Sequence, residues 1–137
     1  MSRLPDSGER SQFETGAQRD ASRGKGLPSE LYPPFLRLMA QRLEDGAEKY
    51  ERGNYRKGIP ISRYLDSLLR HTWQLSEGDT SEDHLGAIGF NAQGIKYTLD
   101  AIEAGNLPES LDDRPWKKQE PEFDGWSLWP ADFPGEK

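Results

Sequence analysis

The chain has 137 residues, of which 33% are hydrophobic and 31% charged, so we expect one domain with a modest core that homo-oligomerisation completes. Its formal net charge of -6 argues against general nucleic-acid binding, and the lack of cysteine excludes disulfides, thiolate metal sites and cysteine nucleophiles. Neither a leader segment nor a run of about eighteen apolar residues is evident, which predicts a cytoplasmic protein without a membrane partner.

The first thirty residues show no sustained hydrophobic periodicity and are rich in glycine, serine and charged residues. This composition predicts a flexible arm over residues 1–30. A helical domain is predicted over residues 31–113, followed by a tail rich in tryptophan and proline over residues 114–137. The tail tryptophans, Trp116, Trp126 and Trp129, leave open a purely structural role in which the tail docks a partner.

The first helix is predicted to begin after the double proline at 33–34, because proline is tolerated at a helix start. Its buried stripe would be Leu36, Met39, Ala40, Leu43 and Ala47. The segment "ERGNYRKGIP" at 51–60 follows, and its two glycines and one proline predict a connector.

Positive charge is concentrated around this connector. Between Lys49 and Arg70 six basic residues face two acidic ones, and three groups with stacking or amide chemistry lie among them. Cations beside aromatic faces suit a nucleotide, although most charge clusters are only solvated surface, and that alternative stays open. The candidate nucleotide ligands here are Lys49, Tyr50, Asn54, Tyr55, Lys57, Arg63 and Arg70.

The second helix is predicted from Ile61 to Ser76, with Ser62 as its N-cap and Gly78 beyond its end. The third is predicted from about Glu82 to Ala104, with Thr80 and Ser81 as capping residues and Gly105 as its stop. The three helices together predict an all-α fold.

Two polar residues, His84 and Asn91, interrupt the apolar stripe of the third helix. His71, at the edge of the stripe of the second helix, could meet His84 across the bundle, with Glu82 and Asp83 beside them. Carboxylates and imidazoles together suit Mg²⁺ or Mn²⁺ that holds phosphates. The alternative is that these polar groups only keep the bundle in register.

Three glycines, Gly86, Gly89 and Gly94, fall inside the third helix, where each costs about 1 kcal/mol relative to alanine. Tight packing against a neighbouring helix would explain them. A flat ligand such as a purine lying against this surface would explain them as well, and both can hold.

Several stretches resemble the phage-type dATP/dGTP diphosphohydrolase N-terminal domain family, which is related to the MazG-like nucleotide pyrophosphohydrolases. They are "FETGAQRD", "GAEKYERGNYRKGIPISRYLDSLLRH", "EGDTSEDHL" and "EAGNLPESLDD", within residues 12–113. The resemblance implies an all-helical, phage-encoded enzyme of the host cytoplasm. It would use a divalent metal to split purine dNTPs into monophosphate and pyrophosphate.

In the enzyme that the resemblance implies, Glu82, Asp83 and His84 would be catalytic and would share the metal with His71. Asn91 would fix an edge of the base or sugar. Three residues depart from the family pattern, namely Glu51, Tyr55 and Ala87. The paired acidic helices of MazG-like enzymes are also not evident, because Asp45 and Glu48 are predicted to point away from the core. These departures keep open an alternative, a phage protein that captures a nucleotide or nucleotide signal without hydrolysing it.

Overall fold

The structure is a computed structural model that describes residues 4–117, and the chain divides into two compact units between Tyr32 and Pro33. The first unit contains an antiparallel hairpin of β1 (Arg10–Gln12) and β2 (Gln18–Asp20), in which Arg10 pairs with Asp20, and a 3₁₀ helix at Pro28–Glu30. The sequence pattern did not predict this hairpin, because strands of three residues are too short to show alternation.

Asp20 holds the hairpin unit together through side-chain contacts. Its carboxylate accepts hydrogen bonds from Ser7 Oγ at 2.5 Å and from Lys25 Nζ at 2.8 Å, and it pairs with Arg10 Nη1 at 3.2 Å. These interactions lower the pKa of Asp20, with the Lys25 hydrogen bond as the largest cause. Polar contacts therefore organise this unit where apolar burial is scarce.

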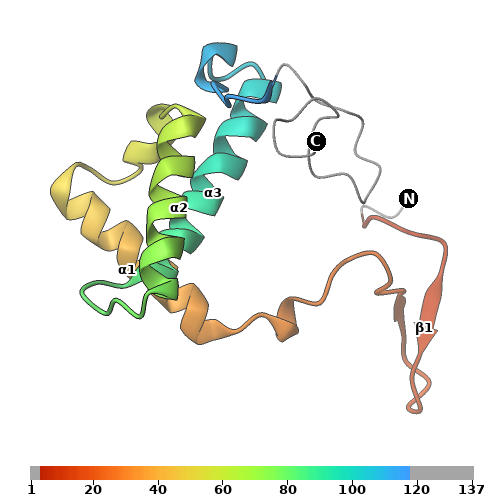
Figure 1. The fold of residues 1–137 in the computed structure, drawn as a ribbon. Coiled ribbons are helices and arrows are strands. Elements are labelled where there is room, and N and C mark those ends of the chain that lie inside the picture. The colour runs from red at the N-terminus through yellow and green to blue at the C-terminus, as the bar shows by residue number, and fades with distance from the viewer. Residues whose placement is uncertain (1–3, 118–137) are drawn as a thin grey trace, which may run out of the picture. The chain divides into compact units, whose positions relative to one another are not determined.

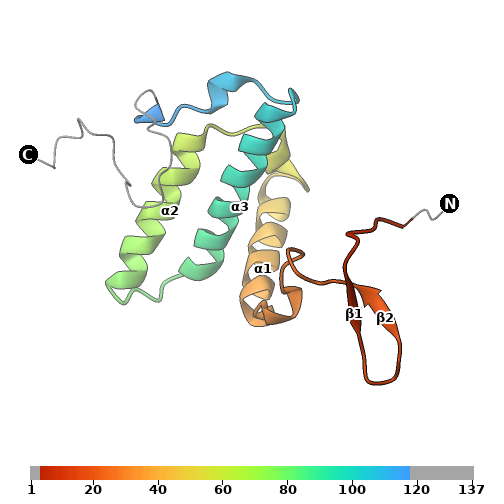
Figure 2. The ribbon, with the colours of Figure 1, turned by 90° about the vertical axis from the view of Figure 1, so that its right-hand side faces the viewer.

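The second unit is built from α1 (Pro33–Lys49), α2 (Ile61–Ser76) and α3 (His84–Glu103), with short 3₁₀ helices at Asn54–Lys57 and Glu109–Leu111 (Figure 1). The predicted all-α fold with three main helices is confirmed. Helix α3 lies between α1 and α2 (Figure 2). Residues on α3 can therefore contact both other helices.

The helix ends follow the predicted glycines but not the predicted caps. Gly78 and Gly105 have positive φ angles of 79° and 78°, as expected of glycines just beyond α2 and α3. Neither Thr80 nor Ser81 caps α3, because the N-cap is Asp83, whose side chain accepts the Gly86 N–H at 2.9 Å.

The predicted N-cap of α2 is also wrong. Pro60 occupies that position and makes no side-chain cap. Ser62 instead donates to Asp113, which follows α3 in the sequence. Asp113 Oδ1 accepts the Ser62 N–H at 2.8 Å, and Oδ2 accepts the Ser62 hydroxyl at 2.6 Å. A residue 51 positions away in sequence therefore satisfies the first turn of α2.

The core among the described residues is small. Its buried apolar residues are Ile61, Tyr64, Ala87 and Ala101, and its buried polar residues are His71, His84, Asn91 and Thr98. Such a core agrees with the low apolar content of the sequence. None of the helices described is both long and apolar enough to cross a membrane.

The glycines of α3 pack against the neighbouring helices. A Cβ atom at Gly89 would lie 2.8 Å from Met39 Cγ on α1, and one at Gly94 would collide with the Tyr64 ring on α2. A Cβ at Gly86 would meet the Leu38 carbonyl oxygen at 3.0 Å. The tight-packing interpretation is confirmed, and the flat-ligand interpretation is wrong for these glycines because protein atoms fill the space.

Candidate functional site

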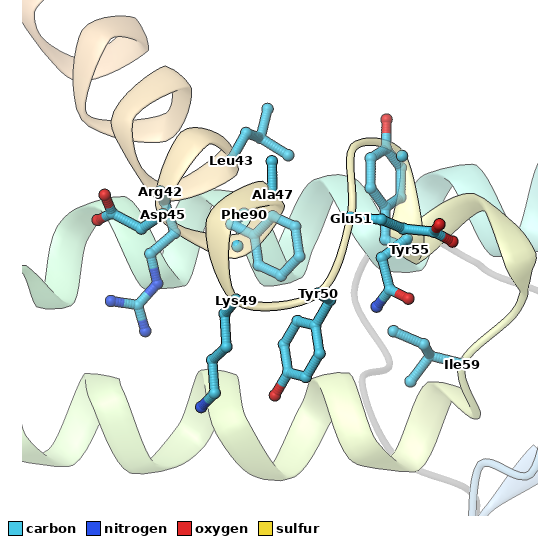
Figure 3. Close-up of a pocket in the computed structure, with 13 residues that line it drawn as sticks. Arg42, Leu43, Asp45, Ala47, Lys49, Tyr50, Glu51, Tyr55, Ile59 and Phe90 are labelled. Carbon is cyan, nitrogen blue, oxygen red and sulfur yellow. The ribbon is translucent and has the colours of Figure 1, made fainter.

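A pocket of about 300 Å³ lies where the end of α1 and the connector approach α3 (Figure 3). Its wall combines aromatic rings with charges of both signs. The aromatic and charged lining residues are Arg42, Asp45, Lys49, Tyr50, Glu51, Tyr55 and Phe90. A concave site with an apolar wall and a few polar groups is the usual setting for a small-molecule ligand.

The two pocket tyrosines differ in how firmly they are held. Tyr55 meets Phe90 edge-on at 6.0 Å between centroids and Tyr97 at 5.4 Å, and its hydroxyl accepts from Arg56 Nε at 3.3 Å. Tyr50 is 64% exposed, and Lys49 Nζ lies 5.4 Å from the centre of its ring. Tyr55 is therefore a fixed wall, whereas Tyr50 offers an open stacking face.

The two basic residues that line the pocket extend toward α2. Figure 3 shows Arg42 and Lys49 pointing to the same side of α1, with Tyr50 beside them. Arg42 and Lys49 are seven residues apart, which places them on one face of the helix. This face therefore presents positive charge toward α2.

The predicted contact between the two histidines is confirmed. His71 Nδ1 lies 2.9 Å from His84 Nδ1, and His84 Nε2 lies 2.6 Å from Asp79 Oδ2. Both rings are buried. Burial is the largest cause that lowers the pKa of His71 below its usual value of 6.5, and the Glu82 carboxylate opposes it.

Arg42 joins this cluster to the pocket. Its Nη1 and Nη2 atoms both lie 3.3 Å from Glu82 Oε1, and Nη2 lies 3.4 Å from His71 Nε2. Sequence reasoning missed Arg42, because it flanks the apolar stripe of α1 and its reach to α2 and α3 leaves no local signal. Its separation of seven residues from Lys49, which places both on one helix face, is the one signal that could have suggested Arg42.

The remaining predicted residues divide between the pocket and other places. Lys49, Tyr50, Asn54 and Tyr55 line the pocket, and Lys57 forms an ion pair with Glu51 at its margin. Arg63 and Arg70 are exposed on α2 and are not among the lining residues. Asp45 does line the pocket, although its wheel position predicted that it points away from the core.

Asp83 and Asn91 have structural partners instead. Asp83 caps α3, and Asn91 Nδ2 donates to Ser67 Oγ at 3.1 Å and to the Ala87 carbonyl at 2.8 Å. Asn91 thereby ties α3 to α2, as the register interpretation predicts. Neither side chain is among those that line the pocket.

The donor set around His71 fits a divalent cation. His71, Glu82 and His84 each offer one ligand atom within 4.8 Å of the others. His71 Nε2 and Glu82 Oε1 are 3.8 Å apart, a separation that two ligands of one ion can span with bonds of about 2.1 Å. Of these donors the Glu82 carboxylate suits Mg²⁺ and Mn²⁺, whereas imidazole is preferred by later transition metals. In the structure the Arg42 guanidinium contacts these same two atoms, so positive charge is accommodated there.

Comparison with known proteins adds a family to this geometry. The sequence model described as "dATP/dGTP diphosphohydrolase, N-terminal" matches residues 15–104, which include the pocket and the histidine cluster. A dATP/dGTP diphosphohydrolase of Salmonella phage PMBT28 is 32% identical over 109 residues, covering 78% of this chain and 36% of that protein. The chain therefore spans about a third of that relative. No solved structure matches the chain.

Proposed function

The chain belongs to the dATP/dGTP diphosphohydrolase N-terminal family, and we propose that its helical unit binds a purine deoxynucleoside triphosphate and takes part in hydrolysing it to monophosphate and pyrophosphate. The observation that carries this proposal is Arg42, which lines an aromatic and cationic pocket and contacts His71 and Glu82. Ligand binding and hydrolytic chemistry would meet at this residue. Because its relative comes from a phage, the protein would be phage-encoded and act in the host cytoplasm.

Within the pocket the charges and rings suggest separate roles. Arg42 and Lys49 would neutralise the phosphates, since guanidinium and ammonium groups are the usual phosphate ligands. Tyr50 would stack on the purine, and the Asn54 amide would read an edge of the base. Lys57 is paired with Glu51 and would contribute less.

A divalent cation, Mg²⁺ or Mn²⁺, would be held by His71 and Glu82, with His84 and Asp79 behind them. When bound, such a cation polarises phosphate oxygens and activates water. Asp83, predicted as a ligand, would act here by fixing the first turn of α3, which carries His84 and follows Glu82.

Incubation of the purified chain with each dNTP and either Mg²⁺ or Mn²⁺, with the products separated by chromatography, tests the proposal. We expect dAMP or dGMP with equimolar pyrophosphate, and a loss of at least tenfold in rate for His71→Gln and Glu82→Gln. Glu77→Gln, an acid at the end of α2, is the matched control and should keep the wild-type rate. Release of inorganic phosphate, or equal rates in all variants, would contradict the proposal.

A second candidate, nucleotide capture without hydrolysis, is favoured by one observation. Arg42 neutralises Glu82 in the position that a cation would occupy. In that case the same assay would return unchanged dNTP that stays bound through gel filtration, and the His71 and Glu82 variants would bind as wild type does.

A further inference from the structure

Four side chains from separate elements form one continuous series of polar contacts. Asp79 Oδ2 lies 2.6 Å from His84 Nε2, His84 Nδ1 lies 2.9 Å from His71 Nδ1, and His71 Nε2 lies 3.4 Å from Arg42 Nη2. Each imidazole therefore uses both of its nitrogens. Because a neutral imidazole has one donor and one acceptor nitrogen, the two ends of the series determine where its protons lie.

Asp79 fixes the first end as an acceptor. Its Oδ2 also accepts a hydrogen bond from Ser81 Oγ at 2.7 Å, and this bond, followed by that of His84, lowers the pKa of Asp79. An ionised carboxylate only accepts, so His84 must carry its proton on Nε2. Neutral His84 then presents an unprotonated Nδ1 to His71.

Arg42 fixes the other end as a donor. A guanidinium has no acceptor, so His71 Nε2 must be the acceptor where Nη2 approaches it. His71 then carries its proton on Nδ1 and donates it to His84 Nδ1. The two ends lead independently to the same arrangement, in which every hydrogen points from Arg42 toward Asp79.

The charged alternatives conflict with these neighbours. An imidazolium at His84 would donate from Nδ1 and force the His71 proton onto Nε2, where it would face the N–H groups of Arg42. An imidazolium at His71 would itself carry a proton on Nε2, which would face the same N–H groups of Arg42. The groups that act on His71 are Glu82, Arg42, His84 and Arg70, and of these only Glu82 is negative.

We propose that Asp79 and His84 are positioning residues that hold His71 in the tautomer protonated on Nδ1, which leaves the Nε2 lone pair as the imidazole position offered to a divalent cation. Arg42 covers this lone pair in the structure, and phosphates in the pocket would draw Arg42 away from it. The inference deepens the proposed function by naming the ligand atom. The tautomers themselves do not depend on whether the chain hydrolyses nucleotides.

The proposal is tested by ¹⁵N NMR of the full chain, because its sequence contains only two histidines. With no metal or nucleotide at pH 7.5, we expect pyrrole-type signals from His84 Nε2 and His71 Nδ1 and pyridine-type signals from His84 Nδ1 and His71 Nε2. A His71 ring protonated on Nε2, an imidazolium at either site, or fast averaging of both tautomers would overturn it. This measurement needs no variant and no activity.

Asp79→Asn then tests the positioning role. An asparagine amide can donate to His84 Nε2, and the same replacement in a catalytic triad stabilises the wrong tautomer. We expect the single-tautomer pattern of both histidines to be lost, whereas Asp66→Asn, an exposed acid on α2, should leave it unchanged. If a folded Asp79→Asn protein keeps the wild-type His71 signals, Asp79 does not position His71. Should that variant not fold, Asp79→Ala takes its place, because it removes the acceptor of His84 Nε2 and should also abolish the single-tautomer pattern.

Discussion

Arg42 is the residue on which both halves of the candidate site depend. Replacement by glutamine keeps a hydrogen-bonding side chain but removes the charge, and hydrogen bonds to charged groups contribute about 1.5–3 kcal/mol. We therefore expect Arg42→Gln to raise the dissociation constant for dATP or dGTP about 10- to 100-fold in isothermal titration calorimetry. Affinity for Mn²⁺ alone should rise, since the guanidinium no longer competes at His71 and Glu82.

The matched control is Arg37→Gln, which removes the same charge from an exposed position on α1. It should leave both affinities unchanged. If Arg42→Gln bound nucleotide as tightly as the wild type, the phosphate role of this residue would be refuted.

At the level of single residues, the sequence predicted the site unevenly. The meeting of His71 and His84 followed from their places on two helical stripes, and the pocket role of Lys49, Tyr50, Asn54 and Tyr55 from one basic connector. Arg42 was missed, and Asp83, predicted as a metal ligand, caps α3 instead. The role of each residue depends on which partner its side chain reaches. That choice is made by tertiary packing and leaves no period in the sequence.

Helix packing makes opposite predictions for two glycines. In α3, Gly94→Ala would place a methyl group against the Tyr64 ring, and such overpacking costs about 1–3 kcal/mol in unfolding free energy. In α1, nothing lies within 4 Å of a Cβ at Gly46, so Gly46→Ala should stabilise the fold by about 0.5–1 kcal/mol through helix propensity. Urea unfolding followed by circular dichroism measures both, and equal effects of the two variants would contradict the packing account.

Asp113 predicts a pH dependence at the start of α2. The Ser62 hydroxyl and N–H lower the pKa of Asp113 below 3.8, so its contribution to stability is present above that pH and is lost as the pH falls through the folded-state pKa. We expect Asp113→Ala to lower the thermal midpoint by about 4–8 °C at pH 7. The difference from wild type should shrink below pH 3.8, whereas a constant difference down to pH 2 would exclude the carboxylate as its cause.

At the level of elements, helix ends were predictable where proline or glycine marks them. The bounds of α2 match the prediction because Pro60 and Gly78 enclose it. The start of α3 was placed two residues early, since Asp83 caps it in preference to the hydroxyl residues before it. The hairpin of the first unit depends on contacts of Asp20 with residues up to 13 positions away, which local patterns do not report.

At the level of the whole molecule, the candidate site lies in a chain that covers only part of its phage relative. Arg42, His71, Glu82 and Phe90 all lie in the helical unit and within the family match, yet the chain spans 36% of its phage relative. The pocket described here is formed by residues 42–90 of this chain. Assays on this chain consequently measure what these 137 residues do by themselves.

Homo-oligomerisation remains a prediction, and the surface of α2 shows where to test it. Leu69 and Trp73 are one helical turn apart and are 46% and 62% exposed, so they form an apolar surface that a second copy of the chain could cover. We expect sedimentation velocity to give a mass above 15.6 kDa for the wild type, with a concentration-dependent fraction of monomer. The double variant Leu69→Lys/Trp73→Lys should sediment as a monomer with unchanged helical content, because charges at the centre of an apolar interface are not tolerated. Leu27→Lys, at a more exposed apolar residue of the other unit, is the control and should associate as the wild type does. A wild-type chain that stays monomeric at all concentrations would show that the small core suffices alone.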